Sequence, residues 1–489
     1  MMSRSLSKVP LEKIDNYTWR IPKKYEPGMR VPGLVFADEA LLEKMKTDRT
    51  LHQCVNVAHL PGIYKYAITL PDGHEGYGFP IGGVAATDYE EGVVSPGGVG
   101  YDINCGVRLL TTNLTEKDIR PKLAELTNAI FNNVPCGLGS RRRDFRVTTH
   151  ELDRLVVEGV QWLIDQGLGW SEDAEHCEEK GSMKAANPDK VSTRAKNRGL
   201  PQVGTLGSGN HFLEVQRVGK IYNPQVAKTF GIEQEGQITA MIHCGSRGFG
   251  HQICSDYLRI MERAVHKYKI ALPDRELACA PGTSPEAQDY YQAMACAVNY
   301  AFVNRQAITH WMRQSFEQVF KKPAESFGLN LVYDVAHNIA KVENHNVGES
   351  KRKVWIHRKG ATRAFGPGNP EVPADYRAVG QPVIIPGSMG TGSWVLVGTT
   401  KAMDVSFGST AHGAGRMMSR SAAKRRFWGK DVKRALEQRG IITRAASFVV
   451  LAEEADPAYK NVDKVAEVSD KVGIATRVVR LSPIAVIKG

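Results

Sequence analysis

Short apolar runs, separated by polar and glycine-rich segments, recur along the chain and predict β-strands. Such runs lie at 212–218, 238–242, 329–335, 383–385 and 394–397. Apolar stretches of this length, bounded by glycine, serine, asparagine or proline, are typical of strands. We therefore expect a β-containing core assembled from segments that are far apart in the sequence.

A second pattern, with apolar residues at helical spacing, predicts helices between these strands. Thr115-Glu-Lys-Asp118 resembles a capping box and precedes leucine and isoleucine at helical spacing, which predicts a helix over 116–132. Ser284-Pro285 is typical of a helix start and predicts a long helix that ends near Gln318. Further helices are expected at 38–45, 152–163, 418–438 and from about 255.

The composition is that of a globular chain with a basic excess. Of 489 residues, 42% are hydrophobic and 24% are charged, and the formal net charge is +12. Such an excess favours polyanionic partners such as nucleic acid or nucleotides, although surface lysines that only solubilise the protein remain an alternative. The eight cysteines are scattered without a CxxC pair, which favours a reducing cytoplasm over a disulfide framework.

Five residues in different parts of the chain are candidate metal ligands. Asp102 and Cys105 lie in one glycine-rich stretch, and His211, His243 and His337 each lie at the edge of a predicted strand. A thiolate binds or bridges borderline metals, and a neighbouring carboxylate can share one of them. Five ligands exceed one tetrahedral site and fit two ions that share the thiolate. A lone histidine on an apolar run is more often a core residue, and the spacing leaves open whether the five meet.

Two loops contain glycines and a further histidine. The loops 386–393 and 412–416 can bind phosphate through exposed backbone N–H groups, although neither matches the usual nucleotide fingerprints. His412 lies in the second loop, where glycine neighbours are expected to leave its imidazole accessible. A neutral imidazole can attack phosphorus and form a covalent intermediate, so His412 is a candidate nucleophile.

No internal repeat, low-complexity tract or linker divides the chain. The predicted fold class is therefore α+β, a single large interwoven domain over 1–489 with β-sheets carrying the metal site at strand ends and with peripheral helices. Residues 140–200 are expected as a charged surface insertion, and residues 255–320 as a helical block. No apolar run approaches the 18 residues of a membrane span, and no apolar stretch typical of a secretory signal follows the N-terminus.

Other interpretations explain part of this pattern. Asp72, His74 and Glu75 are further site candidates, for which a simple Pro-Asp-Gly turn is at least an equal alternative. A dinuclear metallophosphoesterase would explain the metal ligands and the basic charge, but not a nucleophilic histidine or the phosphate-binding loops. A non-catalytic RNA-binding scaffold would explain the charge and leave the ligand-like residues without a role.

Four motifs, in this order, resemble those of the RtcB family of RNA ligases. The resemblance extends from near residue 50 to the terminal Val-Ile-Lys-Gly. One departure is Cys244, because the family more often has serine or threonine after the ligand that matches His243. The motifs are Gly-Tyr-Asp-Ile-Asn-Cys-Gly-Val-Arg at 100–108, Gly-Ser-Gly-Asn-His-Phe-Leu-Glu at 207–214, Asp-Val-Ala-His-Asn at 334–338 and His-Gly-Ala-Gly-Arg at 412–416.

The resemblance implies a GTP- and manganese-dependent RNA ligase of tRNA splicing or RNA repair. Such an enzyme joins an RNA 3′-phosphate or 2′,3′-cyclic phosphate to a 5′-hydroxyl. His412 would take guanylate from GTP and pass it to the RNA 3′-phosphate, and the 5′-hydroxyl would then displace GMP. The implied partners are RNAs with such ends, for example tRNA halves, and an archease activator. A cytoplasmic location is expected.

The same resemblance implies two manganese ions. One ion would be held by Asp102, Cys105 and His211. The other would be held by Cys105, His243 and His337. Thiolate and imidazole ligands by themselves favour zinc, so the choice of manganese rests on the resemblance.

Nucleotide contacts are also implied at matching positions. The apolar tail 484–487 is expected to dock into the body and to hold Lys488 in place. Arg247, Arg416 and Arg420 are candidates for contacts with RNA or phosphate. The guanylate would contact Asn210, His211, Phe212, Leu213, Glu214, His337, Asn338, Pro386, Gly387, Ser388, Met389, Ser393, His412, Gly413, Ala414, Gly415 and Lys488.

Overall fold

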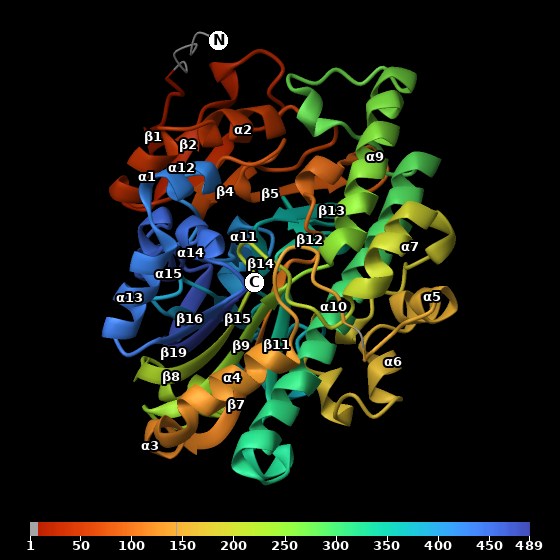
Figure 1. Ribbon diagram of the computed structural model, residues 1–489. Coiled ribbons are helices and arrows are strands. Elements are labelled where there is room, and N and C mark those ends of the chain that lie inside the picture. The colour runs from red at the N-terminus through yellow and green to blue at the C-terminus, as the bar shows by residue number, and fades with distance from the viewer. Residues whose placement is uncertain (1–7, 143) are drawn as a thin grey trace.

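The computed structural model describes residues 8–142 and 144–489, and two large β-sheets form its centre (Figure 1). The eight-stranded sheet has the order β11-β7-β9-β8-β19-β16-β15, and β18 pairs in parallel with β19. All its other neighbouring strands are antiparallel. Its strands are β7 (Gly106–Thr115), β8 (Phe212–Ile221), β9 (Gln237–Cys244), β11 (Leu331–Ala336), β15 (Pro382–Ile385), β16 (Ser393–Gly398), β18 (Ile442–Ala445) and β19 (Ala475–Lys488).

The seven-stranded sheet has the order β1-β2-β3-β4-β5-β13-β12. Two short ribbons, β6 with β10 and β14 with β17, lie outside the large sheets. The strands are β1 (Glu12–Lys13), β2 (Thr18–Ile21), β3 (Gly33–Phe36), β4 (Ala67–His74), β5 (Ile81–Asp88), β12 (Asn338–Val347), β13 (Ser350–Lys359), β6 (Val93–Val94), β10 (Ala280–Pro281), β14 (Ala361–Arg363) and β17 (Ser409–Ala411).

Helices surround these sheets, with α9 and α10 packed side by side on one flank (Figure 1). Apolar side chains of α4 and α10 pack with those of β8 and β9 in one shared core. The helices are α1 (Glu39–Met45), α2 (Thr50–Val57), α3 (Glu116–Ile119), α4 (Leu123–Asn133), α5 (Thr149–Glu158), α6 (Val160–Ile164), α7 (Thr193–Gly199), α8 (Pro224–Thr229), α9 (Arg247–Lys267), α10 (Pro285–Phe320), α11 (Thr400–Val405), α12 (Arg420–Arg426), α13 (Gly429–Gln438), α14 (Phe448–Glu453) and α15 (Val462–Val472).

The sequence patterns predicted most of these elements. All five apolar runs are strands, namely β8, β9, β11, β15 and β16. The helix start at Ser284-Pro285 is confirmed, because the Ser284 side chain accepts a hydrogen bond from the Ala287 N–H and α10 begins at Pro285. The capping box at Thr115–Asp118 is also present. The α+β fold class, with a single interwoven domain and peripheral helices, is confirmed.

Some predicted helices are interrupted or have different ends. The helix expected over 152–163 is divided at Gly159, whose φ of 66° is outside the helical region. The helix expected over 418–438 is two helices, α12 and α13, separated by extended backbone at Phe427 and Trp428. Helix α9 begins at Arg247, eight residues before the expected start, because its first turns contain glycines instead of an apolar pattern.

The charged segment 140–200 contributes buried groups to the interior. The Asp173 carboxylate binds the Arg313 guanidinium with N–O distances of 2.6 and 2.7 Å. Glu178 is fully buried and pairs with Lys341. The charges of this segment are therefore not all solvated, which corrects the expectation of a purely surface insertion there. Across the described residues, no helix combines the length and the apolar composition that crossing a bilayer requires.

Candidate active site

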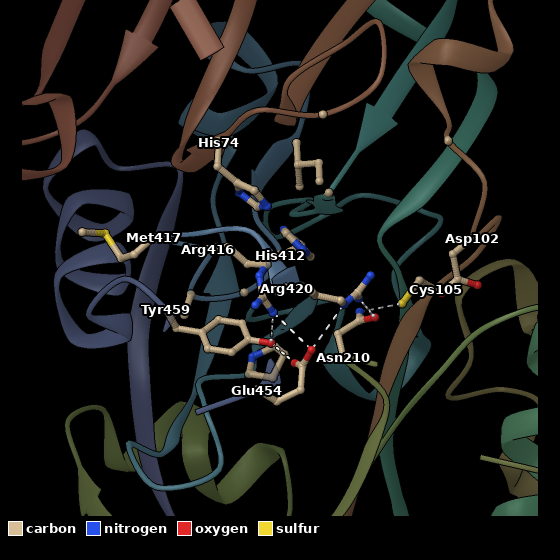
Figure 2. Close-up of a pocket in the computed structure, with 18 of the residues that line it drawn as sticks. His74, Asp102, Cys105, Asn210, His412, Arg416, Met417, Arg420, Glu454 and Tyr459 are labelled. Atoms are coloured by element: carbon tan, nitrogen blue, oxygen red, sulfur yellow. Dashed lines mark hydrogen bonds and ion pairs between the residues drawn. The ribbon is translucent and has the colours of Figure 1, made fainter. Parts of the chain in front are cut away.

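A cavity of about 750 Å³ opens among loops that come from distant parts of the chain (Figure 2). Its walls include parts of 74–77, 99–105, 386–389 and 412–420, together with Lys488. Cavities of 300–1,000 Å³ are typical of sites for nucleotide-sized ligands. Polar and charged side chains from all these segments face the same space, so the cavity is the candidate active site.

The metal ligands predicted from the sequence meet at one edge of the eight-stranded sheet. Cys105 precedes β7, His211 precedes β8, and His337 follows β11, whereas His243 lies near the end of β9. Antiparallel pairing places Val107 and the residue after His211 opposite His243. The strand register therefore brings together side chains that are up to about 230 residues apart.

Three of the five ligands form a compact cluster. One ligand atom each of Asp102, Cys105 and His211 lies within 4.8 Å of the others. His211 Nε2 is 2.8 Å from Asp102 Oδ2 and 3.7 Å from Cys105 Sγ. On its other side, Cys105 Sγ is 3.2 Å from His243 Nε2. The thiol thus lies between two imidazoles, the position that a bridging ligand requires.

His337 completes the group at the far side of His243. The two ring centroids are 5.7 Å apart. Within the described part of the chain, neither ring nitrogen of His337 has a hydrogen-bond partner, and Nδ1 of His243 has none either. Buried polar atoms are nearly always bonded, so these free nitrogens fit a site that is completed by a ligand such as a metal ion.

The protonation states of His243 and His337 suit metal binding, whereas burial of His211 is outweighed by the nearby Cys244 and Asp102, which raise the pKa of His211 above its usual value. Burial lowers the pKa of His243 and of His337 well below the usual value, so both imidazoles are neutral. Burial opposes ionisation of Asp102, but the neighbouring His211 outweighs it and lowers the pKa of that carboxyl. Burial and the Asp102 charge raise the pKa of Cys105 to about 11, so a bound cation is needed to stabilise the thiolate.

Supporting contacts orient the cluster. His211 Nδ1 lies 2.9 Å from the Leu206 carbonyl, which leaves Nε2 directed at Asp102 and Cys105. Cys244 donates to the same carbonyl, with a distance of 3.0 Å from its sulfur. The Cys244 sulfur is fully buried and lies on the opposite side of the His211 ring from Cys105. It therefore supports the orientation of His211.

His412 is held against the cavity by a buried carboxylate. Its Nδ1 lies 2.5 Å from Asp72 Oδ2, and its backbone N–H donates to the same oxygen at 3.0 Å. The His412 ring centroid is 5.1 Å from that of His337, so the imidazole adjoins the metal cluster. In the neutral ring, donation from Nδ1 to Asp72 leaves the lone pair on Nε2. The sequence had named Asp72 only as one of a group, since 340 residues separate it from His412.

His74 and Glu75, which the sequence pattern grouped with Asp72, also line the cavity. His74 Nδ1 lies 3.0 Å from the Asp72 carbonyl. Burial and the nearby Lys460 lower the pKa of His74 to about 3, so its ring is neutral. Figure 2 shows the His74 ring directed toward His412. The turn at Pro-Asp-Gly is thus part of the site wall.

The predicted nucleotide contacts divide into two sets. One set lines the cavity, and the other lies behind this lining. Two residues behind the lining have visible supporting roles: Ser393 accepts a hydrogen bond from the Gly387 N–H at 3.3 Å, and Glu214 lies near Lys488. Burial raises the pKa of Glu214 to about 8. The first set lines the cavity and comprises Asn210, Phe212, Asn338, Pro386, Gly387, Ser388, Met389, His412, Gly413, Ala414, Gly415 and Lys488, whereas His211, Leu213, Glu214, His337 and Ser393 lie behind this lining.

The C-terminal tail docks into the body of the protein, as expected. Residues 484–487 are part of β19, a central strand, and are buried. Lys488 Nζ lies 3.6 Å from Glu454 Oε2 and 5.3 Å from the centre of the Phe212 ring. Burial lowers the pKa of Lys488, although the nearby Glu454 and Glu214 act in the opposite direction.

The three candidate arginines have different surroundings. Arg416 and Arg420 line the cavity and both pair with Glu454, at 3.1 and 3.4 Å. Arg420 also donates to Asn210 at 3.3 Å. Arg247 is not part of the cavity lining and donates to Thr205 at 3.3 Å.

Several lining residues escaped the sequence interpretation. Glu454 and Tyr459 hold Arg416, and Lys359, Tyr77 and Tyr101 form another part of the wall. Tyr101 lies within the motif at 100–108 but was not singled out, and the other four belong to no recognisable spacing. Their common position depends on the packing of segments that are distant in the chain.

Comparison with known proteins places this architecture in one family. The model of the family "tRNA-splicing ligase RtcB" matches residues 53–489. The chain is 59% identical over 481 residues to the tRNA-splicing ligase RtcB of Thermococcus kodakarensis, which covers 98% of this chain and 99% of the relative. Proteins of the same name from Pyrobaculum aerophilum and Archaeoglobus fulgidus are 58% and 55% identical over 483 and 479 residues, again with 98% and 99% coverage. The chain therefore belongs to the RtcB family of tRNA-splicing ligases.

Proposed function

We propose that this protein is a GTP- and manganese-dependent RNA ligase. It joins RNA 3′-phosphate or 2′,3′-cyclic phosphate ends to 5′-hydroxyl ends in tRNA splicing or RNA repair. The observation that carries this proposal is the imidazole of His412, oriented by Asp72 and adjoining His337 of the metal cluster. A nucleophile beside a metal cluster, in a cavity of nucleotide size, supports phosphoryl transfer more directly than simple phosphate hydrolysis.

His412 acts as the nucleophile toward GTP. Its Nε2 forms a bond to the α-phosphorus while the bond from that phosphorus to pyrophosphate breaks. Asp72 accepts the Nδ1 hydrogen bond and stabilises the positive charge that develops on the ring. The guanylate then passes to the RNA 3′-phosphate, and the 5′-hydroxyl displaces GMP to form the phosphodiester. A cyclic phosphate end is first hydrolysed to the 3′-phosphate.

The residues fit two metal ions that share Cys105. Asp102, Cys105 and His211 would hold one ion, and Cys105, His243 and His337 would hold the other. Bound manganese would neutralise charge on the phosphate oxygens during transfer. The free ring nitrogens of His243 and His337 support this assignment. The ligand set by itself also suits zinc, and manganese follows from membership of the family.

The loops 386–389 and 413–415 of the cavity wall bind the guanine nucleotide. Residues 386–389 and 413–415 line the cavity, and because the Gly387, Ser388 and Ala414 N–H groups donate within the protein, those of Met389, Gly413 and Gly415 remain for phosphate oxygens. Lys488 and Asn210 supply a cation and an amide at the same wall. Arg416 and Arg420, which line the cavity, and Arg247, which lies outside its lining, contact RNA phosphates. We further propose that the substrates are RNA strands, that the protein is located in the cytoplasm and that an archease activates it.

Mass spectrometry of the intact protein after incubation with GTP and manganese tests this function. We expect one added guanylate, labile in acid and comparatively stable in base, as a phosphoramidate on histidine should be. His412→Ala should bind metal and fold normally but add no guanylate, while the exposed-histidine variant His266→Ala should behave as the wild type. An acid-stable adduct, an adduct on lysine, or phosphate hydrolysis without any covalent label would contradict the proposal.

A further inference from the structure

We propose that Lys359, Tyr77 and Tyr101 form a separate subsite for the RNA strand that carries the 5′-hydroxyl. Lys359 binds the first phosphodiester of this strand, and the tyrosine pair stacks against its terminal bases. This inference rests on the proposed function and names the position of one of its two RNA substrates. All three residues line the cavity, and none belongs to the metal cluster or the nucleotide loops.

Lys359 is a buried cation without a carboxylate partner. Its side chain is at the end of β13, and the residue is only 5% exposed. The ammonium donates to the carbonyls of Tyr77 and Gly97, and no carboxylate of the described residues forms an ion pair with it. Burial lowers the pKa of Lys359 to about 8, which leaves it mainly protonated at neutral pH.

Two other buried lysines have carboxylate partners, whereas Lys460, like Lys359, donates to a carbonyl but does not line the cavity. Lys341 pairs with Glu178, and Lys488 pairs with Glu454. A buried charge is normally compensated, because leaving it unpaired is unfavourable. An ammonium has three donors, and the two carbonyls use two of them. The third donor and the uncompensated charge of Lys359 therefore fit an anion that enters the cavity.

The position of Lys359 in the cavity indicates which RNA strand supplies this anion. A methyl group added at Gly100 would lie 3.3 Å from Lys359 Cε, and one added at Gly360 would lie 3.0 Å from His412 Cε1. Lys359 thus lies between the nucleophilic histidine and the loop that carries Asp102. The nucleotide loop contacts the following residues of the histidine loop instead, since the Ala414 N–H donates to Pro386 at 3.0 Å.

In-line displacement then favours the 5′-hydroxyl strand at this wall. The attacking oxygen and the leaving oxygen lie on opposite sides of the phosphorus in phosphoryl transfer. The leaving GMP is bound at the loop 386–389 and Lys488. The attacking 5′-hydroxyl therefore enters from the wall that contains Lys359.

Two aromatic rings adjoin the ammonium. The rings of Tyr77 and Tyr101 meet edge to face, with centroids 5.6 Å apart, and the far side of Tyr101 stacks on His251 at 4.9 Å. Both tyrosines are half-buried, so part of each ring is accessible from the cavity. Aromatic rings beside a cation are typical of sites for single-stranded nucleic acid, because bases stack on the rings and phosphates bind the cation.

The test is the isolated sealing step, with a pre-activated RNA–guanylate and a titrated 5′-hydroxyl strand. Lys359→Met should raise the KM for the 5′-hydroxyl strand about ten- to hundredfold, the range of a charge-assisted hydrogen bond. Tyr101→Leu should raise it less, and Lys359→Arg should restore part of the loss. The rate of self-guanylylation and the KM for the 3′-phosphate strand should stay within about twofold. The exposed-lysine variant Lys401→Met is the matched control.

A 5′-hydroxyl strand whose first linkage is an uncharged methylphosphonate isolates the contact. With this strand the wild type and Lys359→Met should have the same KM. If Lys359→Met no longer folds or binds metal, the KM of Tyr101→Leu for the 5′-hydroxyl strand tests the subsite instead. An unchanged KM in a wild type that seals RNA, or an effect on the 3′-phosphate strand instead, would overturn the subsite alone. A wild type that neither adds guanylate nor seals RNA would overturn the proposed function as well.

Discussion

Two groups of buried polar residues adjoin strands β7 and β11, and they differ in how completely their atoms are bonded. In the first group, Asp334 accepts hydrogen bonds from Arg108 and Arg305, with shortest N–O distances of 2.8 Å, and all three are fully buried. In the second group, His243 and His337 retain ring nitrogens without hydrogen-bond partners among the described residues.

This difference in hydrogen bonding distinguishes the group that supports the backbone from the group that can bind a ligand. Arg305 also donates to the backbone carbonyls of Asn104 and Cys244, so the bonded group fixes the backbone that carries the candidate metal ligands. Asn104 has a φ of 49°, a left-handed conformation that such contacts stabilise. The unbonded group keeps its nitrogens free at the sheet edge. In these two groups, full bonding accompanies backbone support, and the unbonded ring nitrogens of His243 and His337 accompany the candidate ligand site.

The largest expected effect comes from breaking the supporting group. Asp334→Ala would leave two buried guanidinium groups without their carboxylate. Removing one partner of a buried ion pair destabilises a protein by about 3–5 kcal/mol, so we expect at least this loss in the free energy of unfolding. Chemical denaturation measures it. Glu158→Ala, which removes an exposed pair with Arg154, should cost far less. Equal losses in the two variants would contradict the comparison.

Breaking the binding group should affect metal content instead of the fold. Cys105→Ser replaces the thiol that lies between His211 and His243, so the affinity for both ions should fall together, by at least about a hundredfold. Elemental analysis after dialysis measures the loss. The metal-free variant should unfold within about 1 kcal/mol of the metal-free wild type. Cys54→Ser, at a buried cysteine outside the site, is the control. Retention of two ions per chain by Cys105→Ser would contradict the shared-ligand assignment.

The sequence pattern singled out His243 and His337 of the unbonded group as candidate ligands, but it assigned no role to the supporting group. Ligand residues at the ends of apolar runs can be recognised, because strand ends meet at a sheet edge and the residue types suggest the chemistry. Arg108 and Asp334 lie in the motifs at 100–108 and 334–338 but were given no role there, and Arg305 has no such signal. Pairing between Asp72 and His412 also depends on contacts across 340 residues, which no local pattern contains.

The same reasoning explains the elements that the hydrophobic pattern did not predict. Strands β12 and β13 form a hairpin whose interior includes Lys341, Glu343 and Arg358, all buried in ion pairs. These charged residues conceal the strand alternation, since their burial depends on partners from elsewhere in the fold. Helix α2 lies in a region rich in glycine, proline and histidine, where local composition favours loops. By contrast, α10 was predictable because its start depends on adjacent residues alone.

The smallest expected effect is a change in the free energy of unfolding. It should have opposite signs when either of two buried histidines is replaced. His337 and His357 are both fully buried, but His357 Nε2 accepts a hydrogen bond from the Ser95 N–H at 3.2 Å, whereas the described chain offers neither nitrogen of His337 a partner. In metal-free protein, His337→Leu removes an unsatisfied polar group and should raise the free energy of unfolding by about 1–3 kcal/mol. His357→Leu leaves the Ser95 N–H unpaired and should lower it by a similar amount. Denaturation in the presence of a chelator measures both changes. With excess metal the gain of His337→Leu should disappear, because the wild type then recovers the binding free energy of the ion. Destabilisation of both metal-free variants would mean that His337 is an ordinary core residue, and that unbonded nitrogens do not mark the site.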